Sequence, residues 1–129
     1  MSSPDLTASG TAPEELLESA EQLLTSAVPG VGAQGPRACA LLIRLALEMT
    51  LDRYWERVLP SAAECGMRAQ LLLLPLYTSG MPEAAPLARE AWLGLAGAAH
   101  HHAYELAPTV SELRGWHTAV SRLAALLRS

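Results

Sequence analysis

The chain has no lysine and no phenylalanine, and aromatic residues make up only 5% of its 129 residues. Strands are enriched in aromatic and β-branched residues, whereas this sequence holds 23 alanines and 24 leucines, which favour helices. The composition therefore predicts an all-α protein. A chain of this length is expected to form one domain with its own hydrophobic core.

Cysteine and long apolar runs are also scarce. Cys39 and Cys65 are the only cysteines, they lack CxxC spacing, and no secretory leader is recognisable, which predicts reduced thiols that serve as small core residues in a cytoplasmic protein. The uncharged, mostly apolar stretches 69–82 and 91–104 have 14 residues each. They are shorter than the roughly 20 residues that cross a bilayer, so we expect no membrane span.

The charge is unevenly distributed along the chain. The formal net charge is -4, and residues 1–35 contain five acids and no arginine, whereas residues 36–129 contain nine arginines and eight acids. This balance excludes a basic nucleic-acid surface over the whole molecule. Because arginine binds phosphate and carboxylate bidentately, a local arginine patch stays compatible with the sequence.

Helix start and stop signals divide the chain into five predicted helices. Residues 1–10 are rich in Ser, Pro and Gly and are predicted to form a flexible tail, and 11–129 a single domain. Three capping-box patterns begin at Thr11, Ser61 and Thr109. The signals predict an antiparallel bundle of five helices over 11–28, 36–58, 60–75, 83–106 and 109–128.

The last predicted helix carries an apolar seam. Its members recur at three- and four-residue spacing: Leu113, Trp116, Val120, Leu123 and Leu127. The preceding helix has a row of small residues, including Gly94 and Ala98, that permits a close crossing. The pattern is typical of helix packing, and both an internal core and a dimer contact fit it.

Three consecutive histidines, His100 to His102, end the fourth predicted helix. Consecutive helical residues point about 100° apart, so at most two of them share one site. His101 and Glu105 lie four apart, and the carboxylate could orient the imidazole for proton transfer. Tyr104 lies four after His100. The loop before the last helix could bring Arg114 and His117 close to this segment.

Two other roles for the histidines stay open. Histidines in a last helical turn stabilise its negative end, which is a purely structural role. A zinc site built from the histidine run with His117 or Glu105 is a weaker alternative, because HxxxH and HExxH spacings are absent. We therefore expect no metal and no cofactor.

The segment AAHHHAYELAPTVSEL in a helical bundle resembles the HEPN superfamily, in particular its small stand-alone bacterial members. The resemblance covers about 12–128 as architecture and about 98–113 as motif. It implies a homodimer, and active members are metal-independent ribonucleases that use an Arg and a His four to six residues further on, contributed by both chains. The implied chemistry is proton transfer by the His and stabilisation of phosphorane-like charge by the Arg.

The resemblance assigns roles to residues near the histidine run and on the last helix. The implied acid, base and charge-stabilising groups are His101, His102, Glu105, Arg114 and His117, and the implied RNA contacts are His100, Tyr104 and Arg89. This sequence departs from the pattern, since no arginine precedes a histidine at that spacing and the closest pair is Arg114 with His117. The arginine would have to come from elsewhere in the dimer.

Two functions from different classes follow from the sequence. The first is a HEPN-like ribonuclease or RNA-binding factor in stress or phage-defence systems of the toxin-antitoxin kind. The second is a scaffold without catalytic activity that dimerises or binds a protein partner.

Overall fold

The computed structural model describes residues 12–26, 34–99 and 107–128, and the prediction of an all-α protein is confirmed. These ranges contain six helices and no strand. In chain order they are α2 (Pro13–Thr25), α3 (Gln34–Val58), α4 (Pro60–Ala63), α5 (Met67–Tyr77), α6 (Ala84–Ala99) and α7 (Val110–Arg128). The tail predicted over 1–10 lies outside the described residues.

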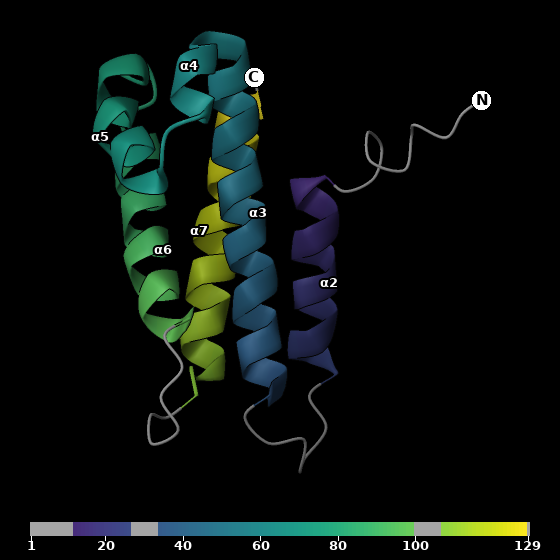
Figure 1. Ribbon diagram of the computed structural model, residues 1–129. Coiled ribbons are helices and arrows are strands. Elements are labelled where there is room, and N and C mark those ends of the chain that lie inside the picture. The colour runs from purple at the N-terminus through teal and green to yellow at the C-terminus, as the bar shows by residue number, and fades with distance from the viewer. Residues whose placement is uncertain (1–11, 27–33, 100–106, 129) are drawn as a thin grey trace, which may run out of the picture.

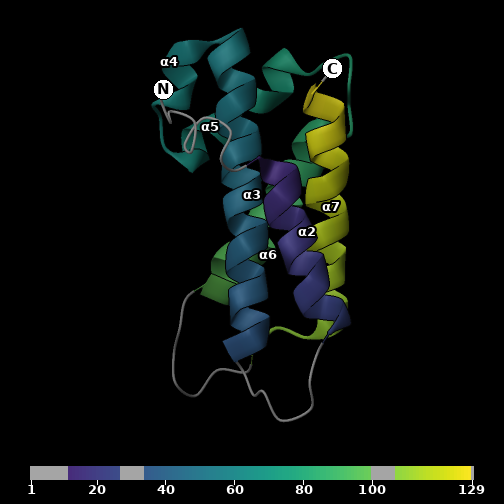
Figure 2. The same cartoon turned by 90° about the vertical axis from the view of Figure 1, so that its right-hand side faces the viewer.

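Four long helices form the body of the molecule (Figure 1). α3 is central and packs against α2, α6 and α7, while α7 also contacts α2 and α6. α2 and α6 descend and α3 and α7 ascend in Figure 1, so consecutive long helices are antiparallel, whereas α3 and α7, which also contact each other, run parallel (see also Figure 2). α5 lies across one end and packs on α6.

The seam of α7 faces the core of its own chain. Leu113, Val120, Leu123 and Leu127 are all at most 2% exposed and belong to one cluster with the buried residues of α3 and α6. The spacing of these residues therefore reflects an intramolecular core. A dimer contact, if the protein forms one, must use another surface.

The prediction of five helices is wrong, because the segment predicted as one helix over 60–75 forms two. α4 ends after one turn, and Gly66 begins α5 as an N-cap residue with extended backbone. Glycine has low helix propensity, so the chain changes direction at this point at little cost. Pro75 does not end the helix as predicted, since α5 continues to Tyr77. The N–H and the hydroxyl of Thr78 then both donate to the Leu74 carbonyl oxygen.

Capping contacts place the starts of two helices. The capping box at Thr109 is confirmed, since the Thr109 hydroxyl accepts from the Glu112 N–H at 3.1 Å and Glu112 accepts from the Thr109 N–H at 2.9 Å. α2 begins one residue later than the pattern indicated, with Ala12 as N-cap donating to Glu15 at 3.3 Å. Both helices therefore have acidic residues in their first turn.

A close crossing joins α6 to α7 at Gly94. A Cβ atom built on Gly94 would lie 2.3 Å from Nε1 of Trp116, so the indole occupies the space that any other side chain would need. The row of small residues predicted on α6 therefore serves the contact between α6 and α7 of the same chain.

Side chains of two tyrosines and one glutamine join α5 to the central helix, α3. The Tyr54 hydroxyl donates to the Tyr77 carbonyl at 3.3 Å, and the fully buried Trp55 packs edge-on against both tyrosine rings. Gln70 donates to the Asp52 carboxylate at 3.0 Å. These contacts and the packing on α6 set the orientation of α5, and leave Leu72 and Leu76 exposed.

The two cysteines differ in their surroundings. Cys39 is 1% exposed, as expected of a core residue, and burial raises the pKa of its thiol. Cys65 is exposed, so its predicted place in the core is wrong. It lies in the turn that separates α4 from α5. None of the helices described here is long and apolar enough to span a bilayer.

Candidate functional site

Five of the eight predicted site residues lie outside the described residues, namely His100, His101, His102, Tyr104 and Glu105. Their assignment as acid, base and RNA-contacting groups stays a prediction. The structure does describe the other three, Arg89, Arg114 and His117.

His117 connects α7 to α2. Its Nε2 lies 2.8 Å from the backbone carbonyl oxygen of Leu17, and the ring is half-buried. Since a carbonyl can only accept, Nε2 carries the proton in this contact. The imidazole therefore acts here as a hydrogen-bond donor between two helices.

Two arginines on α7 face the acidic residues of α2. Arg114 lies 3.7 Å from the Glu21 carboxylate, and Arg128 lies 2.8 Å from that of Glu14. Because the helices run in opposite directions, the start of one meets the end of the other. Surface ion pairs of this kind contribute at most about 1 kcal/mol each to stability. Their main consequence is that the Arg114 charge is already compensated.

Arg89 lies away from the other two residues. It is exposed on α6, whereas Arg114 and His117 share the side of α7 that contacts α2. The structure therefore brings Arg114 and His117 together, one helical turn apart, and leaves Arg89 on a different surface.

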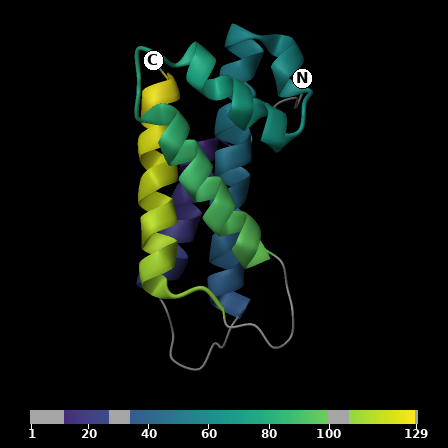
Figure 3. The same ribbon diagram turned by 90° about the vertical axis from the view of Figure 1, so that its left-hand side faces the viewer.

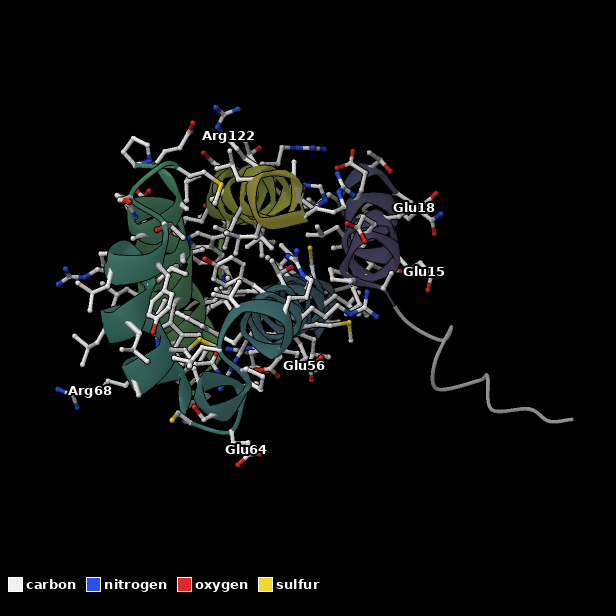
Figure 4. The ribbon with its side chains drawn as sticks, turned by 90° about the horizontal axis from the view of Figure 1, so that it is seen from above. Glu15, Glu18, Glu56, Glu64, Arg68 and Arg122 are labelled. Atoms are coloured by element: carbon white, nitrogen blue, oxygen red, sulfur yellow. The ribbon has the colours of Figure 1, made fainter. Side chains whose placement is uncertain are left out.

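Open depressions flank His117 on either side. One, of about 340 Å³, lies between α2 and α7 and is lined by Glu18, Glu21 and Ser121 among others. A larger one, of about 650 Å³, includes Met81, Thr118 and Arg122. Seen from above in Figure 4, Glu15 and Glu18 mark the α2 side of the bundle and Arg122 the outer side of α7. Within 12–26, 34–99 and 107–128, no group of three or more metal-ligating side chains gathers.

A third depression, which the sequence reasoning missed, collects arginines from two helices. It has a volume of about 210 Å³, and its lining includes Arg53 and Arg57 of α3, Arg128 of α7 and Glu14 of α2. Thr50 also lines it, and the Thr50 hydroxyl is buried without a hydrogen-bond partner. The four-residue spacing of Arg53 and Arg57 was the available signal, since such residues share one helix face.

An apolar surface lies on the opposite side of the molecule. Leu72 and Leu76 of α5 are 73% and 74% exposed, and Leu93 of α6 is 62% exposed. Figure 3 looks onto this side, where α5 and α6 lie in front of α3 and α7. We call Leu72, Leu76 and Leu93 the α5–α6 face.

No family model, curated protein or solved structure matches this chain. The resemblance to the HEPN superfamily accordingly rests on the motif and the helical composition, and it stays a prediction.

Proposed function

We propose that this chain is a helical interaction module that pairs with a second copy of itself through the α5–α6 face. The observation that carries the proposal is the exposure of three large aliphatic side chains on two neighbouring helices. Single exposed leucines are ordinary, whereas several on neighbouring helices are typical of an interaction surface. The α7 seam, which the sequence left open as a dimer contact, is buried in the core of one chain.

Charges on the same two helices and in the turn before α5 support a second copy as the partner. Glu64 and Arg68 are exposed beside the start of α5, and Arg89 and Glu90 are exposed on α6. A two-fold axis brings each surface residue opposite a different residue of the same patch in the other copy. A rim with both charges is therefore complementary to itself, whereas a strongly acidic or basic partner would favour a rim of one sign.

The test is the oligomeric state of the double variant Leu72→Gln with Leu76→Gln. We expect the unaltered protein to sediment as a dimer. The dimer dissociation constant of the variant should be higher by roughly 1000-fold or more, because each leucine contributes about 1.5–3 kcal/mol when buried and a symmetric dimer loses four of them. The matched control is Leu41→Gln with Leu45→Gln, another exposed pair four residues apart, on α3. A wild-type protein that stays monomeric at every concentration, or equal effects of both double variants, would contradict the proposal.

The ribonuclease function implied by the HEPN resemblance is a second proposal. The described residues that flank the histidine run, Ala99 and Ala107, lie at the end of the bundle where α7 begins, and Arg114 lies in the second turn of that helix (Figure 1). This placement supports Arg114 as the charge-stabilising group and His101 and His102 as proton-transfer groups.

The second proposal requires cleavage of a mixed RNA pool in the absence of metal. Replacing His101 and His102 by alanine should abolish cleavage, and Arg114→Gln should slow it by roughly 100-fold or more, as expected for removal of one transition-state donor of about 2.7–4 kcal/mol. Glu21→Gln, which removes the partner of Arg114, should leave the chain folded and not reduce the rate. An inactive wild type, or full activity of the double histidine variant, would refute a catalytic function and leave the interaction module.

A further inference from the structure

The depression between α2, α3 and α7 is lined by four charged side chains and by Thr50, together with the apolar residues Pro13, Ala124 and Leu127. Arg53, Arg57 and Arg128 line it against a single carboxylate, that of Glu14. The bundle as a whole is acidic, so this local excess of positive charge is not a consequence of composition. It belongs to a different side of the molecule from the α5–α6 face, because none of its residues comes from α5 or α6.

Thr50 gives a second and independent sign that a ligand fits here. The residue is 5% exposed, it lines the depression, and its Oγ1 has no hydrogen-bond partner. A buried hydroxyl without a partner destabilises the folded state, and native proteins rarely leave one unsatisfied. A ligand in the depression that accepts a hydrogen bond from this hydroxyl, once the side chains that cover it move aside, would remove that cost.

The arginines keep donors for such a ligand. A guanidinium group has five N–H donors, and the contact of Arg57 with the Leu127 carbonyl uses one nitrogen of Arg57. The Arg128 ion pair with Glu14 joins one nitrogen to one oxygen at 2.8 Å. The Leu127 contact also fixes the Arg57 side chain in place, which reduces the entropy that is lost when a ligand binds.

We propose that this depression binds the phosphoryl group of a small phosphorylated molecule. The remaining donors of Arg57 and Arg128, with the Thr50 hydroxyl, exceed what the two oxygens of a carboxylate accept. A terminal phosphoryl group offers three acceptor oxygens and close to two negative charges. The volume of about 210 Å³ is below that of sites that enclose a whole drug-sized ligand. The depression thus holds the phosphoryl group, and the rest of the molecule extends into solvent.

The test is calorimetric titration of the full chain with inorganic phosphate and, separately, with adenosine 5′-monophosphate, at an ionic strength kept constant with sodium chloride. Thr50→Val replaces the hydroxyl by a methyl group of similar shape. It should weaken binding roughly tenfold, the fold-change of one hydrogen bond to a charged group, and should not lower the melting temperature. Tighter binding of the nucleotide than of phosphate would identify an ester as the ligand, and equal binding would identify free phosphate.

Glu14 and Arg128 give variants with opposite expected effects. Arg128→Gln should weaken phosphate binding by roughly tenfold or more, whereas Glu14→Gln should tighten it, because the carboxylate competes with the anion for the same guanidinium. Both substitutions break the same ion pair. If that pair only supported the structure, the two variants would change phosphate binding in the same direction. Arg68→Gln, an exposed arginine on α5, is the control and should have no effect.

The proposal is refuted if neither probe binds saturably to the wild type. It is also refuted if Glu14→Gln and Arg128→Gln shift the affinity in the same direction, or if Thr50→Val leaves it unchanged. The result is independent of the dimer proposal, since the α5–α6 variants retain every residue of the depression.

Discussion

Replacement of Gly94 by alanine tests the closest helix contact in the bundle. A Cβ atom at this position would lie 2.3 Å from Nε1, 2.6 Å from Cε2 and 2.9 Å from Cζ2 of Trp116. These distances are far shorter than carbon contacts of about 3.5–4.0 Å, and the atoms belong to a rigid ring. The indole or the whole of α7 must therefore move to accommodate one methyl group.

The expected loss follows from two opposing contributions. Overpacking of a filled interface costs about 1–3 kcal/mol, whereas alanine gains up to about 1 kcal/mol over glycine in a helix. We therefore expect Gly94→Ala to lower the free energy of unfolding by about 1–2 kcal/mol, and the melting temperature by roughly 4 °C for each kcal/mol. Circular dichroism measures the free energy of unfolding in a urea titration and the melting temperature in a thermal scan.

Gly115→Ala is the matched control for this substitution. Gly115 lies in α7 beside Trp116, and a Cβ atom there would have no neighbour within 4 Å. The same chemical change should then stabilise the protein by about 0.5–1 kcal/mol through helix propensity alone. Trp116→Phe combined with Gly94→Ala should cost less than the sum of the two single changes, since the smaller ring makes room. If both glycine variants shift stability equally, the proposed contact with Trp116 is refuted.

Three further predictions concern single groups. Cys65 should react with a thiol reagent in the native state, whereas Cys39 should react only on unfolding, because burial both shields it and raises its thiol pKa; equal native rates would contradict this. Thr109→Ala should lower the free energy of unfolding by about 1 kcal/mol through loss of the α7 cap, and Thr109→Ser should retain most of it. The hydrogen-bonded Arg122 lowers the pKa of the Glu83 carboxyl. The stabilisation from this pair should therefore be present above the pKa of the carboxyl in the unfolded state and be lost as the pH falls through its pKa in the folded state. NMR titration measures the pKa of Glu83, and a value that Arg122→Gln does not raise would contradict the prediction.

Much of the secondary structure was predictable because local chemistry decides it. The Thr109 capping box begins α7 where the pattern placed it, and the periodic leucines of α7 are buried as their spacing indicated. The prediction for residues 60–75 was wrong because it treated Gly66 as an ordinary residue and Pro75 as a terminator. Proline removes one backbone hydrogen bond and crowds the carbonyl four residues earlier, and α5 tolerates both effects near its end, two residues before Tyr77.

The candidate sites were less predictable, because they depend on residues distant in the chain. His117 was predicted to be a proton-transfer group, but the structure places its Nε2 against a carbonyl 100 residues away in sequence. Arg114 likewise faces Glu21 of α2. Neither contact has a local pattern, because it arises only from the packing of the last helix on the first.

By itself, the sequence determined the helical class, the start of α7 and the set of residues able to form a core, since propensity, capping and periodicity act over a few residues. Only the tertiary structure decided that the α7 seam is internal, that Trp116 fills the space beside Gly94, and that Arg53, Arg57 and Arg128 line the same depression as Thr50. The physical reason is that helix periodicity specifies which side chains share a face, whereas the partner of each face depends on how all the helices fill one volume together.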